Sequence, residues 1–256
     1  MFINDYVIQS YILLKILEYQ YLSNHQPRNL TYHLTSSLGL DIIKGKYNVG
    51  EVLPTEIVLS AELEVSRSAL REAVKMLAAK GLIQSIRKKG IVVLPKSNWN
   101  MFDEDVLKWI LSSNPTISLL KSFTEVRMAI ELQAASLACI NANSTDLDKI
   151  AHSLDRMKAA DKGLDDPLEA DIAFHTSILE ASGNPFFSRL TGFISTALKV
   201  SIRYTNAAQG KSGDIAMHES VYENIKSKNT VKAQIAVKAL LATVFELINS
   251  YENDSL

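Results

Sequence analysis

Cysteine is almost absent from this sequence, since Cys139 is the only one among 256 residues. A single cysteine excludes a disulfide within the chain and a metal site built on several thiolates. The sequence therefore suits a reducing compartment such as the cytoplasm.

Long apolar runs are also missing. No stretch reaches the roughly 18 uninterrupted apolar residues of a membrane-spanning helix. The nearest, Tyr6 to Leu22, is interrupted by Lys15 and Glu18, and it lacks the cationic start and small-residue cleavage site of a secretory signal. We therefore expect neither membrane association nor export.

Common catalytic motifs are missing as well. The sequence contains no nucleophile elbow, P-loop or dinucleotide-binding fingerprint. These absences argue against several large enzyme classes, and we predict that the protein is not an enzyme.

The sequence has almost no net charge, because it contains 27 Lys and Arg and 28 Asp and Glu. The balance hides an asymmetry along the chain. Residues 31–96 carry ten Lys and Arg against six Asp and Glu, a net charge of +4, whereas residues 97–256 carry fifteen against twenty, a net charge of −5. A basic first part is typical of a protein that binds nucleic acid there.

The basic part contains the pattern of an amphipathic helix. Ser66 is placed to cap its N-terminus, and the helix is predicted to run to about Lys80, before Gly81. One face is apolar: Leu70, Ala73, Val74 and Leu77. A flanking stripe is basic: Arg67, Arg71 and Lys75. At the start of such a helix Ser66, Arg67 and Ser68 can hold phosphates, while Arg67 or Arg71 reaches a guanine edge.

A basic hairpin is predicted to follow this helix. Two β-prone runs, 82–86 and 91–94, are joined by Arg87-Lys88-Lys89-Gly90. Consecutive cations at a hairpin tip repel one another unless a polyanion is near, and Gly90 can adopt the positive φ of a turn. With helices expected at 29–44 and 55–63, the segment is typical of a winged helix-turn-helix. The alternative is a solvated helix with ordinary surface arginines.

The motifs LPTE, VSRSALREAVKMLAAKGLI and KKGIVV resemble the DNA-binding domain of the GntR family of bacterial transcription regulators. The resemblance implies contacts with double-stranded operator DNA at Ser66, Arg67, Ser68, Arg71, Lys89 and Gly90, with Lys88 adding a cation at the same tip. Two positions depart from the family pattern, because Ile57 replaces a usual arginine and Ile91 a frequent threonine. These departures concern which operator sequence is bound.

The rest of the chain lacks a β pattern. Asn, Gly and Pro punctuation separates about seven predicted helices: 103–112, 116–141, 144–162, 167–182, 185–204, 214–227 and 230–250. We predict a mainly α fold, in which a winged helix-turn-helix precedes an all-α antiparallel bundle. The expected divisions are an N-terminal extension at 1–30, a DNA-binding domain at 31–95, a linker at 96–102 and a helical domain at 103–250. The extension is either a docking helix or the product of an over-long translation start.

Five ionisable residues fall on apolar stripes of the predicted bundle. They are Arg127 and Glu131 on helix 116–141, Asp171 and His175 on helix 167–182, and His218 on helix 214–227. Buried charges are normally paired, ligated or placed on a polar cavity. Two interpretations stay open: separate buried pairs of Arg127 with Glu131 and Asp171 with His175, or a cavity for a small carboxylate or a metal ion.

The motifs EVR-x-x-x-E, D-x-x-x-H and S-G-N-P, with a late histidine opening a helix, resemble the effector-binding FCD domain of the FadR subfamily of GntR regulators. This resemblance implies an effector site at the same five residues. It also implies a divalent metal, zinc or similar, held by Asp171, His175 and His218. The family's fourth ligand, a histidine, falls on Leu240. Three ligands bind a metal more weakly and leave a position open.

The stretch N-W-N-x-x-D-x-D-V-L-x-W at residues 98–109 resembles the galactonate-responsive branch of this subfamily. That resemblance implies a sugar acid, an aldonate or uronate, as effector, with Arg127 as its carboxylate clamp. We therefore predict a homodimeric repressor of sugar-acid catabolic genes that binds a near-palindromic operator in the cytoplasm, at the nucleoid. The alternatives are a response to another small carboxylate, a metal-dependent enzyme using Asp171, His175 and His218, and a nonspecific architectural DNA binder.

Overall fold

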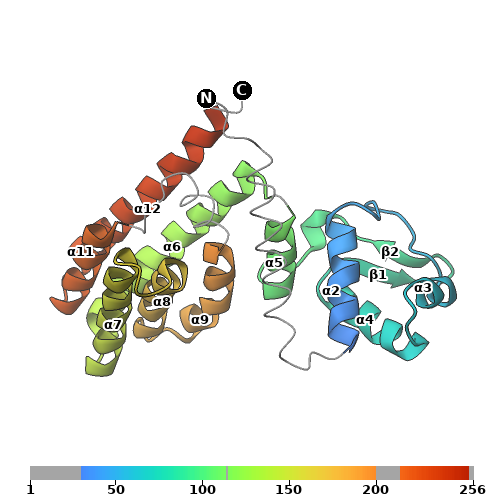
Figure 1. Cartoon of the computed structure of the whole chain (residues 1–256), viewed down its shortest axis with the longest axis horizontal. Helices are drawn as coiled ribbons and strands as arrows, with labels where there is room; N and C mark the ends of the chain where they lie inside the picture. The colour runs from blue at the N-terminus through green and yellow to red at the C-terminus, as the bar shows by residue number, and fades with distance from the viewer. Residues whose placement is uncertain (1–29, 114, 200–213, 254–256) are drawn as a thin grey trace. The chain divides into compact units, whose positions relative to one another are not determined.

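The computed structural model describes residues 30–113, 115–199 and 214–253. The chain divides into two compact units, unit 1 at Met1–Lys96 and unit 2 at Ser97–Leu256 (Figure 1). Helices dominate the described residues, and a single two-stranded sheet is found among them. The predicted mainly α fold is confirmed. Apart from Leu30, the extension expected at 1–30 lies outside the described residues.

Unit 1 is a winged helix-turn-helix. Its elements are α2 (Leu30–Ile43), α3 (Glu56–Glu62), α4 (Arg67–Ala79), β1 (Ile83–Ile86) and β2 (Gly90–Val93). The two strands pair antiparallel, with Ile83 opposite Val93 and Ile86 opposite Gly90, and Val52 forms a bridge to Val92. The predicted helices and strands of this part all exist, with ends that differ by at most about two residues, a normal uncertainty for helix termini.

The core of unit 1 lies under α4. The apolar face that its spacing predicts is buried: Leu70, Ala73, Val74 and Leu77. Fully burying one leucine contributes roughly 1.5–3 kcal/mol, so this face fixes which side of α4 is left to solvent. The helix ends at Ala79, and Gly81 follows with a φ of 79°, a conformation that glycine adopts without strain.

Unit 2 is all-helical within the described ranges. After a short 3-10 helix, η1 (Lys96–Asn98), its elements are α5 (Glu104–Ser112), α6 (Ile117–Asn141), α7 (Ser144–Asp161), α8 (Pro167–Ala181), α9 (Pro185–Arg189), a helical stretch at 191–199, α11 (Ile215–Lys226) and α12 (Thr230–Asn253). Within this unit α6 packs against α12 and α8, α7 against α8, and α11 against α12. No described helix is long and apolar enough to cross a membrane.

The helix predicted at 185–204 is wrong as a single element. Its start, α9, ends at Arg189, and the N–H of the capping residue Leu190 bonds to the Phe187 carbonyl three residues back instead of four. A second helical stretch then covers 191–199, and residues 200–204 lie outside the described residues. In the second stretch Gly192 lies so close to the Glu104 side chain that a Cβ there would overlap the carboxylate.

Candidate functional site

The start of α4 is exposed and carries hydroxyl and guanidinium groups. Ser66 caps the helix as predicted, because its Oγ accepts a hydrogen bond from the Ala69 N–H at 3.2 Å and lies 3.0 Å from the Ser68 Oγ. Arg67 is exposed and has no hydrogen bond or ion pair with any described residue. Free N–H groups and the positive end of the helix dipole make this terminus a site for anions.

Arg71 is held by a residue that sequence reasoning missed. Its Nε donates a hydrogen bond to Glu56 Oε2 at 2.8 Å, which joins α4 to the first turn of α3. Lys75, the third member of the basic stripe, instead pairs with Glu72 of its own helix at 2.8 Å. The Glu56–Arg71 contact spans two helices, so helical spacing gives no signal for it.

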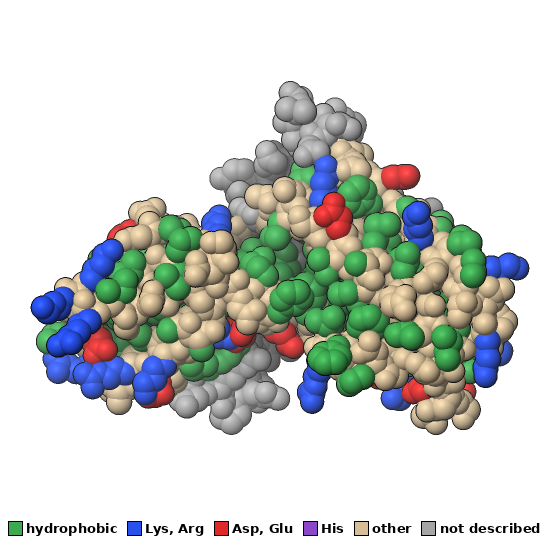
Figure 2. All heavy atoms as spheres, turned by 180° about the vertical axis from the view of Figure 1, so that it is seen from behind, with side chains coloured by type: hydrophobic (Ala, Val, Ile, Leu, Met, Phe, Trp, Pro, Cys, Tyr) green, Lys and Arg blue, Asp and Glu red, His purple; other side chains and the backbone are tan. Residues whose placement is uncertain are grey.

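The hairpin tip consists of Arg87, Lys88 and Lys89, all exposed. Gly90 has a φ of 107°, as predicted, and a Cβ there would lie 3.0 Å from Val52 Cγ1. Lys88 also has a positive φ, 64°, which was not predicted. Figure 2 shows Lys and Arg side chains gathered on the left-hand end of unit 1. The structure therefore presents exposed cations from both α4 and the hairpin.

Five buried ionisable side chains meet inside unit 2. Arg127 and Glu131 come from α6, Asp171 and His175 from α8, and His218 from α11. Arg127 Nε donates to Glu131 Oε1 at 2.6 Å, and His175 Nδ1 lies 2.6 Å from Glu131 Oε2. Asp171 Oδ1 lies 3.0 Å from His218 Nε2 and 3.7 Å from His175 Nε2. The pairs predicted from spacing therefore exist as parts of one cluster.

The two buried carboxyl groups are ionised at neutral pH. Burial raises the pKa of Glu131, but Arg127 and His175 together outweigh burial and hold that pKa at about 2, below its ordinary 4.5. Burial likewise raises the pKa of Asp171, yet the charges of His175, His218 and Arg127 bring it below its ordinary 3.8. Nearby positive groups thus dominate over desolvation at both carboxyls.

In His175 and in His218 the Nδ1 proton is donated in a hydrogen bond. His218 Nδ1 lies 2.7 Å from the Asp214 carbonyl oxygen, which only accepts, so Nδ1 is the donor. His175 Nδ1 donates to the ionised Glu131. In the neutral rings both Nε2 atoms therefore carry lone pairs. The buried Nε2 of His218 makes no hydrogen bond with the described residues, although Asp171 faces it.

These atoms satisfy part of the requirements of a metal site. Asp171, His175 and His218 each offer a ligand atom, and the three atoms lie within 4.8 Å of one another. Around zinc, ligand atoms bonded at about 2 Å lie roughly 3.3 Å apart, so small movements suffice. Arg127 Nη2 lies 3.2 Å from His175 Nε2, and this guanidinium must move before the nitrogen binds a cation.

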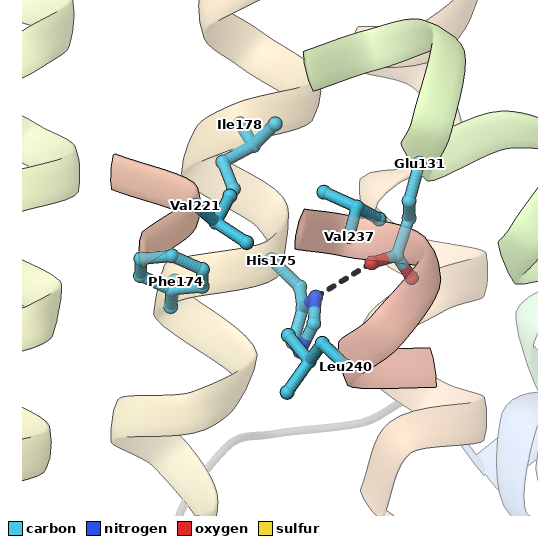
Figure 3. A pocket seen from close by; sticks show the side chains of 7 residues that line it. All are labelled: Glu131, Phe174, His175, Ile178, Val221, Val237 and Leu240. Atoms are coloured by element: carbon cyan, nitrogen blue, oxygen red, sulfur yellow. Dashed lines mark hydrogen bonds and ion pairs between the residues drawn. The ribbon is translucent and has the colours of Figure 1, made fainter. Parts of the chain in front are cut away.

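A small pocket adjoins the cluster (Figure 3). It is lined by Glu131, Phe174, His175, Ile178, Val221, Val237 and Leu240. It is closed in this structure and has no room for a water molecule, whereas typical ligand pockets hold ~300–1,000 Å³. Leu240 of α12 lies beside the His175 ring, so the expected fourth-ligand position faces the pocket with an apolar side chain. Arg127 is not among the lining residues.

Comparison with known proteins identifies both units. Residues 31–93 match the gntR family of bacterial regulatory proteins, and residues 122–243 match the FCD domain. The galactonate operon transcriptional repressor of Escherichia coli is 31% identical over 217 residues, which cover 84% of this chain and 95% of that protein. The chain belongs to the gntR family. A second Escherichia coli relative, the uncharacterized HTH-type transcriptional regulator YieP, is 33% identical over 217 residues and covers 84% of this chain and 93% of its own.

This GntR-family protein has the same fold as a regulator of solved structure. The structure of Lar, which controls the expression of the Listeria monocytogenes agr system, has a TM-score of 0.56 at 19% identity, over 88% of this chain and 99% of that one. The family makes the protein a ligand-responsive, DNA-binding transcription regulator, and it excludes the metal-dependent enzyme considered above. FCD domains often bind a metal ion, and the three-ligand cluster is a candidate for one.

Proposed function

We propose that this GntR-family regulator represses sugar-acid catabolic genes and that a sugar acid, bound beside Arg127, releases it from its operator. The observation that carries the proposal is the buried cluster of Arg127, Glu131, Asp171, His175 and His218. Burying charges inside an apolar bundle is costly, and perturbed pKa values concentrate at binding sites. Similarity to the galactonate operon repressor supports a sugar acid as the ligand.

In this proposal, residues 31–95 form the DNA-binding domain of each protomer of a homodimer. Each protomer places α4 in the major groove of one half-site, so the operator is a near-palindrome. Ser66, Arg67 and Ser68 hold phosphates at the helix start, while Lys88, Lys89 and Gly90 bring the hairpin tip to the backbone or minor groove. Residues 96–102 connect this domain to the effector domain at 103–250.

The charge of the cluster decides how an anionic effector binds. When both histidines are neutral, Arg127 balances one of the two carboxylates of the cluster, and one negative charge is left uncompensated. A carboxylate effector is repelled by that charge. Asp171, His175 and His218 would hold a divalent cation, which would reverse the sign of the charge and offer a position to the effector carboxylate. Arg127, displaced from His175, would be available as a second anchor for the effector.

The closed state of the pocket favours a second candidate, a smaller carboxylate effector. The pocket has no room for a water molecule, and it is bounded by Leu240 and Val237 of α12 and by Phe174 of α8. A six-carbon acid needs these side chains to move apart, whereas a three-carbon hydroxy acid needs less rearrangement. The same cluster serves either ligand, because both present a carboxylate and neighbouring hydroxyls.

A thermal-shift screen separates the two candidates. Aldonates, uronates and three-carbon hydroxy acids are each added with and without zinc, because a ligand that binds the folded protein raises its Tm. We expect a sugar acid to raise Tm more with zinc present and to weaken operator binding about tenfold or more. A sugar acid that binds without changing operator affinity contradicts the proposal. Stabilisation by three-carbon acids alone selects the second candidate.

A further inference from the structure

Three phenylalanine rings form a continuous row in unit 2. The ring of Phe102, the last residue of the linker, lies 5.0 Å from that of Phe193, measured between centroids, and the two planes are tilted by 37°. The Phe193 ring meets that of Phe123 of α6 edge to face, at 5.6 Å and 65°. Both distances fall in the range of favourable aromatic pairs. The row therefore joins the linker to α6 through the helical stretch at 191–199.

The inner end of this row lies one helical turn from the buried ionisable cluster. Phe123 and Arg127 are four residues apart on α6, and side chains at that spacing are neighbours on one face of a helix. Both are buried, with exposed fractions of 6% and 2%. Because a close-packed interior transmits displacement, a shift of α6 that accompanies the release of Arg127 from His175 moves Phe123 as well.

The outer end of the row is exposed and yet held in place. Phe102 is 60% exposed, so its packing against Phe193 is partial. Its backbone is fixed on both sides, because its N–H donates to Asn100 Oδ1 at 3.2 Å and the next residue, Asp103, caps α5. A ring that packs on the surface of unit 2 can leave its partner without opening the core of that unit.

We propose that the row of Phe102, Phe193 and Phe123 transmits the state of the Arg127 cluster to the linker, and that operator affinity responds to the effector through it. The inference rests on the proposed function, in which effector binding moves Arg127. Coupling between two sites requires an element with two arrangements that both sites bias. With Phe102 packed on Phe193 the linker is fixed and the operator is bound. When Phe193 shifts with α6, the contact is lost and the linker is released.

A coupling role and a structural role predict different results for the loss of the Phe102 ring. In the coupling role, Phe102→Ala populates the released arrangement without effector, so operator affinity falls and effector affinity stays the same or rises. A substitution that only damages the packing of unit 2 lowers the affinity for effector. The direction of the change in effector affinity therefore separates the two roles.

The test uses the full-length protein, an operator duplex that it selects from a random-sequence pool, and galactonate with zinc as the probe. The response is the ratio of operator dissociation constants with and without the probe. We expect a ratio of about ten or more for the unmodified protein and within about twofold of one for Phe102→Ala. Operator affinity of this variant without the probe should fall about tenfold, to the level of the probe-bound unmodified protein. Calorimetric titration should show undiminished affinity of the variant for the probe.

Two further variants serve as controls. Phe186→Ala removes another exposed phenylalanine of unit 2, one that makes no aromatic contact with the described residues, and it should keep the full response. Phe102→Tyr retains a ring at the same position, so it should keep most of the response. Equal responses from Phe102→Ala and the unmodified protein overturn the inference, and so does a loss of probe affinity in Phe102→Ala.

A second measurement needs no ligand. Glu131→Gln removes the charge that pairs with Arg127 and His175, and so it perturbs the inner end of the row directly. Hydrogen exchange, read by mass spectrometry in the peptide that covers the start of α5, reports on the outer end. We expect Glu131→Gln to accelerate exchange there, and the double variant with Phe102→Ala to exchange no faster than Phe102→Ala alone. No acceleration, or an additive one, contradicts the inference.

The two measurements keep the inference and the proposed function apart. If galactonate with zinc leaves the operator affinity of the unmodified protein unchanged, the proposed function fails, and hydrogen exchange decides the inference on its own. If the unmodified protein responds and Phe102→Ala responds equally, the proposed function stands and the aromatic row does not carry the response.

Discussion

Asp171 Oδ1 and His218 Nε2 lie 3.0 Å apart without a hydrogen bond of acceptable geometry between them. Because the Nδ1 proton of His218 is donated to the Asp214 carbonyl, both facing atoms are acceptors when the ring is neutral. Two buried acceptors repel each other unless a proton or a cation comes between them. Zinc binding is therefore the most direct probe of this cluster.

Leu240→His should strengthen zinc binding. The residue lines the same pocket as His175, and the family resemblance predicts the fourth metal ligand at its position. We expect the added imidazole to raise zinc affinity about tenfold or more, measured by calorimetric titration and by the zinc-induced rise in Tm. Leu240→Asn is the control for polarity. Equal zinc affinity in both variants would show that position 240 does not reach the metal.

Arg127→Ala should lower the free energy of unfolding by about 3–5 kcal/mol, because it leaves the buried Glu131 carboxylate without its cation. Denaturant unfolding measures the loss. Arg156→Ala breaks an exposed pair with Asp165 at 2.9 Å and should change stability far less. Under conditions where the Arg127 variant is folded, operator binding should persist while the response to effector disappears. Retention of that response would rule out Arg127 as the effector anchor.

Glu131 should make stability depend on pH. Its folded pKa of about 2 lies below the ordinary 4.5, so the ionised group stabilises the fold above pH 4.5, and this contribution is lost as pH falls toward 2. The contribution is about 3 kcal/mol. Glu131→Gln lacks it, and therefore the stability difference between the unmodified protein and this variant should shrink on acidification. Urea unfolding at several pH values checks this, and a difference independent of pH would contradict it.

Arg67→Ala combined with Arg71→Ala should abolish operator binding, because it removes two cations from the exposed start of α4. Stability should change by less than about 1 kcal/mol, since neither side chain is buried. Fluorescence anisotropy with labelled operator measures the binding. Lys232→Ala combined with Lys238→Ala removes two exposed cations from α12 and should leave binding intact. Undiminished binding by the arginine variant would refute the docking of α4.

Gly192→Ala should destabilise unit 2 by about 1–3 kcal/mol, because the new Cβ overlaps the Glu104 carboxylate. The measurement is the midpoint of thermal or urea unfolding. Adding Glu104→Ala removes the obstacle, so the double variant should be at least as stable as Glu104→Ala alone. If Gly192→Ala leaves the unfolding midpoint unchanged, the Glu104 side chain can turn away from the new Cβ at no cost in stability. In that case the close contact between Gly192 and Glu104 does not stabilise the position of α5.

Much of the fold could be predicted because its signals are local. Ser66 begins a helix whose apolar spacing is regular, and Leu70 and Leu77 are buried as that spacing requires. The burial of Arg127 and His175 could be predicted in the same way, since each interrupts an apolar stripe of its own helix. The break at Leu190 could not be predicted from the sequence, because no proline or glycine stands at that position. The approach of Glu104 to Gly192 could not be predicted either, because the two residues are far apart in the chain.

The contacts between side chains of different helices could not be predicted from the sequence either. Nothing in the spacing of α6 or α8 indicates that Glu131 accepts from both Arg127 and His175. The Glu56–Arg71 pair joins residues 15 positions apart and depends on the angle between two helices. Such pairings become visible when the packing of the helices is known, and they determine how the predicted residues act together.

The backbone of the hairpin tip is strained at its central residue. Lys88 adopts a φ of 64°, where glycine or asparagine is the comfortable choice and a lysine is strained by roughly 1 kcal/mol. Glycine at position 88 would relax this turn but would remove the middle one of three consecutive cations. Stability and positive charge therefore make opposite demands on this residue, as is common at functional sites.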